Sequence, residues 1–115
     1  MRGGKERLGD ILQSIEDIQT FISGITEARF LKIDETDRKT FRAVCDCIST
    51  LGEAVKNLSS DIKDKNDGID WVGLAGMKDM VTHQYFRVRL DLIWNTIAME
   101  LPDLKVFVEH EVSSD

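Results

Sequence analysis

The stretch Phe41–Leu58, FRAVCDCISTLGEAVKNL, is the most informative one about the fold of this chain. Its apolar residues recur at steps of three and four positions: Phe41, Val44, Cys45, Ile48, Leu51, Val55 and Leu58. That spacing places them on one face of an α-helix. Charged residues lie on the exposed face, namely Asp37, Arg38, Lys39, Arg42 and Asp46. We therefore expect a long amphipathic helix here, with Asp34 or Thr36 as its N-cap.

The same helical period governs the sequence on both sides of this stretch. A first helix is predicted by Leu8, Ile11, Leu12, Ile15, Ile18, Ile22 and Ile25, with Gly24 as a stop signal. Asp70 is the expected cap of a third helix that begins at Trp71, and the helical pattern is interrupted after Phe86. Leu90–Leu101 predicts a fourth helix, and Pro102 suits the first turn of a terminal one.

No stretch of the chain alternates polar and apolar residues for long enough to predict a strand. The predicted fold is therefore all-α, an antiparallel up-and-down bundle of four main helices plus short helices. A chain of 115 residues is ordinary for a single domain, and no linker or repeat divides it. We expect one domain over residues 1–115.

Composition and charge exclude several classes of function. The chain carries 15 Lys and Arg against 21 Asp and Glu, a formal net charge of −6, which disfavours general binding to nucleic acid. No apolar run approaches the roughly 20 residues that span a bilayer. Met1–Asp10 lacks the apolar region of a secretory signal. We therefore expect a cytoplasmic protein with no membrane partner.

The cysteines and histidines do not predict a metal site. Cys45 and Cys47 stand two positions apart in a helix, where they point to nearly opposite sides, so one buried and one boundary thiol are expected. His110 is far from both cysteines in the sequence, and a zinc site needs about four ligands. Glycine motifs that cradle phosphates are absent as well. No metal or cofactor is predicted.

The unusual part of the sequence is Gly73–Arg89, GLAGMKDMVTHQYFRVR, which we call the basic segment. In the sequence, the basic residues Lys78, Arg87 and Arg89 lie close to His83. Asp79 is the single acidic residue of the basic segment. In an acidic chain this is a local concentration of positive charge. From the residues alone, a histidine in such a helix is more often structural than catalytic.

Helical geometry separates the polar residues of the basic segment. Gly73, Gly76 and His83 share one face of a regular helix, whereas Lys78 lies on another side. Two glycines inside a helix are unfavourable unless another backbone packs closely there, either in the same chain or in a partner. Bringing Lys78 and His83 to one ligand needs a distorted helix end or a second copy, so a homodimer is predicted.

The sequence resembles the HepT-like proteins of the HEPN superfamily, small helical ribonuclease toxins of prokaryotic toxin–antitoxin pairs. The resemblance covers nearly the whole chain. It is carried by RLGDILQSI (Arg7–Ile15), LGEAVKNLS (Leu51–Ser59), DWVGLAGMKDMVTHQYF (Asp70–Phe86) and LDLIWNTIAMELPDLK (Leu90–Lys105). The fold it implies is the HEPN-like helical bundle.

The resemblance also implies the site. The family motif is Arg, four to six residues and then His, often followed after one residue by Tyr, and its Arg and His act together to cleave RNA without a metal ion at a dimer interface. Here His83 matches the His, Tyr85 the Tyr and Asp79 the polar residue beside the Arg. Lys78 stands where the family has Arg. The implied catalytic residues are therefore His83, as acid or base, and Lys78, as the phosphate-binding cation.

The family's partner is commonly a nucleotidyltransferase antitoxin, which in some pairs attaches AMP to the motif tyrosine. Tyr85 is thus a candidate modification site, and the alternative for it is ordinary packing on Phe86 and Trp94. Because Lys replaces the motif Arg, a second hypothesis is a catalytically weak or inactive dimeric module that binds such a partner. A third is a helical scaffold with no role on nucleic acid.

Overall fold

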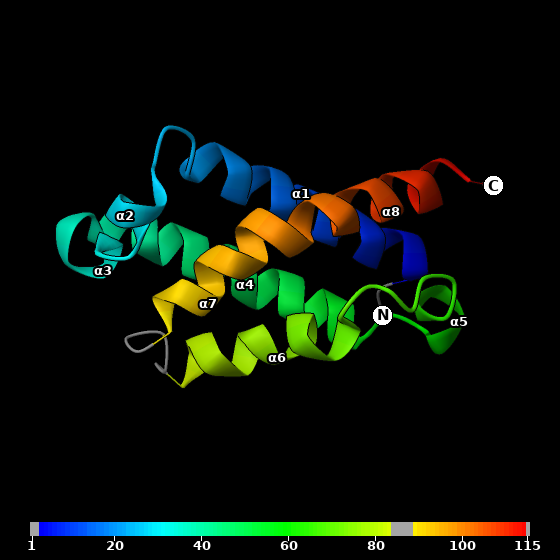
Figure 1. Cartoon of the computed structure of the whole chain (residues 1–115). Coiled ribbons are helices and arrows are strands. Elements are labelled where there is room, and N and C mark those ends of the chain that lie inside the picture. The colour runs from blue at the N-terminus through cyan, green and yellow to red at the C-terminus, as the bar shows by residue number, and fades with distance from the viewer. Residues whose placement is uncertain (1–2, 84–88, 115) are drawn as a thin grey trace.

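The computed structural model describes residues 3–83 and 89–114, and these residues are almost entirely helical, with no strand among them (Figure 1). Three long helices are α1 (Gly4–Phe21), α4 (Arg38–Lys56) and α6 (Trp71–Thr82). A fourth rod consists of α7 (Leu90–Asn95), a π-helical segment η2 (Thr96–Glu100) and α8 (Leu101–Ser113). Short helices α2 (Glu27–Phe30), α3 (Ile33–Thr36) and α5 (Ser60–Lys63) lie in the connections. The predicted all-α class is confirmed.

The long elements alternate in direction along the chain, which gives the predicted antiparallel bundle (Figure 1). Helix α4 lies at the centre and packs against both α1 and α6, while α8 packs against α1. The apolar stripe of α4 is buried, as are the matching positions of the other helices. Fully buried side chains include Ile11, Ile15, Ile18, Phe30, Val44, Val55, Leu74, Ile93, Leu104 and Val108. The hydrophobic effect of this shared core holds the four rods together.

The cap of α6 is the predicted one, whereas the cap of α4 is not. Asp70 caps α6 as predicted, because its Oδ1 accepts the Gly73 N–H at 2.9 Å. For α4 the predicted caps, Asp34 and Thr36, are wrong, since both lie inside α3. The cap is Asp37, which accepts from Thr40 N at 3.2 Å and from Thr40 Oγ1 at 2.7 Å. These hydrogen bonds lower the pKa of Asp37.

The fourth rod continues through Pro102, where we expected a new helix. Pro102 does lie in the first turn of α8, but η2 joins α7 to α8 without a loop. Proline has no N–H to donate to the carbonyl four residues earlier, and its ring crowds that carbonyl. A wider π-helical turn just before Pro102 accommodates this loss, and Thr96 Oγ1 donates to the Leu92 carbonyl at 3.0 Å.

None of the helices in the described parts of the chain is both long enough and apolar enough to cross a membrane.

Candidate functional site

Of the basic segment, the structure describes residues 73–83, which belong to helix α6 and its C-cap His83, and Arg89. The start of α6 is anchored by Trp71, whose Nε1 donates to the carbonyls of Lys63 and Asn66 at 3.1 and 3.0 Å. Leu74 and Met77 are buried against the core. Tyr85 and Arg87 lie outside the described residues, so the predictions on them stay predictions.

Lys78 is bound to the neighbouring helix. Its Nζ donates to Glu53 Oε2 at 2.6 Å, and the two side chains are 35% and 48% exposed. The hydrogen bond from Lys78 is the main reason that the pKa of Glu53 is lowered, followed by one from Asn57. The cation at the motif position therefore has a carboxylate partner within the chain.

Gly52 explains why Lys78 faces α4. A Cβ atom at Gly52 would lie 2.9 Å from Lys78 Cβ and 3.1 Å from Lys78 N. Only glycine permits so close an approach of α4 to α6 without displacement of one helix. The approach sets the direction in which Lys78 leaves α6, toward Glu53 on α4.

Gly73 and Gly76 do not mark a close helix contact within the described chain. The prediction that another backbone of the same chain packs closely against these glycines is therefore wrong. Both are exposed, and a Cβ atom at Gly76 would meet nothing within 4 Å. At Gly73 a Cβ would overlap the Asp70 carboxylate. The reason for Gly73 is thus local, because the capping carboxylate occupies the space beside it. A partner copy packing on this face stays a prediction.

His83 is exposed at the C-terminal end of α6, and its Nδ1 lies 2.9 Å from the Asp79 carbonyl oxygen. A carbonyl only accepts, so in the neutral ring the hydrogen is on Nδ1 and the lone pair is on Nε2. Asp79 therefore acts on His83 through its backbone, a role that its match to the motif's polar residue did not indicate. The imidazole is oriented with Nε2 as its basic atom.

Lys78 and His83 are not brought together by α6. Lys78 points to α4 and pairs with Glu53, whereas His83 ends the helix on a different side. This agrees with the expectation that the two are not stacked on one regular helix. Arg89, at the start of α7, is exposed and its Nε lies 3.5 Å from Asp91 Oδ1.

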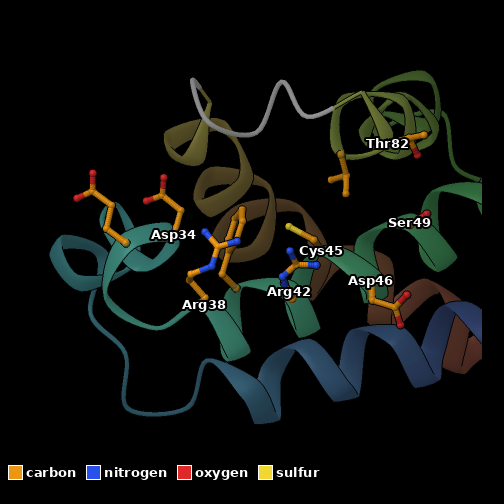
Figure 2. A pocket seen from close by; sticks show the side chains of 10 residues that line it. Asp34, Arg38, Arg42, Cys45, Asp46, Ser49 and Thr82 are labelled. Carbon is orange, nitrogen blue, oxygen red and sulfur yellow. The ribbon is translucent and has the colours of Figure 1, made fainter.

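A groove of about 800 Å³ adjoins this end of α6 (Figure 2). We call it the α4 groove, because most of its wall is the N-terminal half of that helix. Its lining residues are Asp34, Glu35, Arg38, Phe41, Arg42, Cys45, Asp46, Ser49, Val81 and Thr82. The sequence predicted Arg38 and Arg42 on the exposed face of a helix, but it did not predict a groove there. Their spacing of four puts both on one side of α4, which was the available signal.

The cysteines have the predicted surroundings and no sign of reactivity. Cys45 is buried and Cys47 is half-buried, and both are free thiols. Burial raises the pKa of each to about 11, with the charges of Asp17 and Asp46 adding to the effect at Cys47. Both are therefore protonated near neutral pH. Across residues 3–83 and 89–114, no three metal-binding side chains cluster so as to hold an ion.

The sequence of this chain is similar to a family described as ribonucleases and to individual proteins with ribonuclease names. The family model described as "Ribonuclease HepT-like" matches residues 11–111. A protein of Methanocaldococcus jannaschii named "Putative RNase" is 37% identical over 103 residues, which cover 89% of this chain and 82% of that protein. A "Putative RNase" of Caldanaerobacter subterraneus is 35% identical, covering 91% and 90%. A "Probable ribonuclease HepT" of Thermococcus cleftensis is 36% identical, covering 90% and 91%. No solved structure shows a significant match.

Proposed function

This chain belongs to the HepT-like ribonuclease family, as its sequence resemblance indicated, and on that premise we propose that it is a metal-independent endoribonuclease. The observation that carries the proposal is the setting of His83. Its imidazole stands exposed at the motif position, with Nδ1 held by the Asp79 carbonyl and the lone pair on Nε2.

The proposed reaction uses the RNA's own 2′-hydroxyl as the nucleophile. His83 Nε2 takes the proton of that hydroxyl, whose oxygen attacks the adjacent phosphorus while the bond to the 5′-oxygen breaks. The departing 5′-oxygen receives a proton, from His83 of the same or a second copy or from water. The products are a 2′,3′-cyclic phosphate and a 5′-hydroxyl, and the proposed reaction uses no metal ion or other cofactor.

Lys78 is the proposed cation for the phosphate. Its ammonium group has N–H donors beyond the one that Glu53 takes, so it can contact a phosphate oxygen while keeping that partner. It offers a point charge in place of the planar, two-pronged donor set of arginine. We therefore expect charge stabilisation with weaker orientation of the scissile phosphate.

A homodimer is part of the proposal. Because Lys78 and His83 point to different sides of α6, a two-fold partner is one way to bring both to a single phosphate. Among the described residues, nothing lies within 4 Å of a Cβ atom placed at Gly76 on α6, and Val72 on the same helix is 85% exposed. These features support a second copy packing against α6.

We further propose that the protein is the toxin of a type VII toxin–antitoxin pair, neutralised by a nucleotidyltransferase. The support is the family and the motif tyrosine at position 85. AMP attached to Tyr85 would place negative charge and bulk near His83 and oppose an RNA phosphate. A gain of one AMP on Tyr85, seen by mass spectrometry after incubation with such a partner and ATP, is the expected outcome.

The proposed activity is tested by incubating the purified protein with single-stranded RNA in the presence of a chelator. The expected result is internal cleavage, with products that carry 2′,3′-cyclic phosphate ends. Products with 3′-hydroxyl ends, or cleavage that stops when divalent ions are chelated, would contradict the mechanism.

A second candidate function is a catalytically weak module that dimerises and binds the nucleotidyltransferase. The observation that favours it is Lys78 itself, which replaces the motif Arg and is bound to Glu53. Lys78→Arg separates the two candidates. Brisk cleavage by the wild-type chain supports the enzyme, whereas negligible wild-type cleavage that Lys78→Arg raises strongly supports the weakened site.

A further inference from the structure

The α4 groove carries an inference beyond the motif residues. Its walls come from three elements: α3 supplies Asp34 and Glu35, the N-terminal half of α4 supplies most of the lining, and the end of α6 supplies Val81 and Thr82. Thr82 directly precedes His83 in the chain. The groove therefore extends to the last turn of α6, which His83 caps.

Two guanidinium groups point into this groove. Arg38 and Arg42 follow one another by one turn of α4, and Figure 2 shows both side chains projecting into the open space. Among the described residues neither side chain has an ion pair or a hydrogen-bond partner. In contrast, Lys78 pairs with Glu53 and Arg89 with Asp91. The two arginines present planar, two-pronged donors suited to phosphate oxygens.

The rest of the lining suits a single nucleotide better than a long polyanion. Val81, with the edge of the largely buried Phe41 (6% exposed), gives the groove an apolar part of its wall that a base can contact. Asp34, Glu35 and Asp46 would repel an extended run of phosphates. They can instead accept hydrogen bonds from the exocyclic amino groups of a base. A volume of about 800 Å³ is within the usual range for small-ligand pockets.

We propose that the α4 groove is a nucleotide-binding subsite for the RNA substrate, in which Arg38 and Arg42 hold a phosphate close to the end of α6 that His83 caps. The assignment rests on the proposed ribonuclease function. It makes the arginines RNA-binding residues that lie outside the motif and that contribute to affinity rather than to proton transfer.

The test compares two double variants, both made in the His83→Ala background so that RNA is bound but not cleaved. Arg38→Gln/Arg42→Gln removes the charges inside the groove. Lys39→Gln/Lys56→Gln removes the same charge from exposed positions of α4 outside its lining. Affinity for a short single-stranded RNA of mixed sequence is measured over a range of salt concentrations, and thermal unfolding checks that each variant is folded.

The groove variant is expected to bind RNA about tenfold or more weakly. The slope of log affinity against log salt is expected to shrink by about 0.7 for each phosphate that the groove no longer binds. The matched control should differ little from the His83→Ala parent. Equal decreases in affinity in both variants, or no binding of RNA by the parent, would overturn the assignment.

Failure of this inference is distinguishable from failure of the proposed function. If the wild-type chain cleaves RNA and the groove variant keeps the parent's affinity and salt slope, the subsite is wrong and the ribonuclease stands. If the wild-type chain does not cleave RNA but the groove variant loses binding selectively, the subsite stands without the catalysis. If the groove variant keeps RNA binding but loses self-association, the groove is a protein interface and the proposal is overturned.

Discussion

Lys78 Nζ donates a 2.6 Å hydrogen bond to Glu53 Oε2, so the cation at the motif position is tied to a carboxylate of the adjacent helix. The contact joins two residues that are 25 positions apart. It offsets part of the positive charge that an RNA phosphate would meet, and it holds the ammonium group on the α4 side of α6. Glu53 therefore affects both the net charge at this position and the direction of the Lys78 side chain.

Glu53→Gln is expected to raise RNA affinity. The amide keeps an acceptor for Lys78 but removes a negative charge that competes with the phosphate. Because the pair is solvent-exposed, the gain should be only a few-fold and should fade at high salt. Binding of single-stranded RNA at low and high salt checks this. Affinity that falls on substitution would show that Glu53 serves mainly to position Lys78.

Acidification is expected to weaken the fold partly through this pair. The pKa of Glu53 is lowered in the folded chain, so its contribution to stability is complete above the ordinary value of 4.5 and is lost as the pH falls below that value. Urea unfolding at about pH 7 and about pH 3 should therefore show a larger loss of stability for the wild-type chain than for Glu53→Gln. An equal loss in both proteins would show that Glu53 does not contribute to the loss of stability at low pH.

Gly52→Ala is expected to destabilise the protein by about 1–3 kcal/mol, the usual effect of overpacking. The new methyl group would lie 2.9 Å from Lys78 Cβ and 3.1 Å from Lys78 N, so α4 and α6 must move apart. Chemical denaturation measures the change in the free energy of unfolding. An unchanged or increased stability would mean that the two helices are less closely packed than described.

Gly76→Ala is the matched opposite case. Nothing in the described part of the chain lies within 4 Å of a Cβ atom placed there, and alanine has the higher helix propensity, so the single chain should gain up to about 1 kcal/mol. If a second copy packs on this face, the same methyl group should weaken the dimer. Sedimentation over a range of concentrations separates the two effects, and a dimer unaffected by the change would place its interface elsewhere.

The elements of the fold were predictable because their cause is local. The three- and four-residue steps of apolar side chains specify each long helix, and Asp70 marks the start of α6. The sequence predicts the helix that contains Phe41, but it places the cap at Asp34 or Thr36, because it carries no clear signal for the short helix α3. Because those two residues lie within α3, the cap of α4 is Asp37, the next residue with a side-chain acceptor.

For the candidate site, the sequence indicates only the residues that the motif names. His83 and Lys78 follow from the family pattern, but the partner of Lys78 depends on the register between α4 and α6, which the sequence does not encode locally. The close contact of Gly52 with Lys78 of α6 cannot be recognised from the sequence around Gly52 alone. The groove of Arg38 and Arg42 requires three elements to be positioned relative to one another.

The decisive comparison for the proposed ribonuclease is the rate of RNA cleavage by His83→Ala against that by His110→Ala. Both variants remove an exposed imidazole, but His110 lies on α8 outside the motif. We predict that His83→Ala abolishes cleavage of single-stranded RNA in chelator, while His110→Ala retains the wild-type rate. Undiminished cleavage by His83→Ala would show that this histidine does not carry the chemistry.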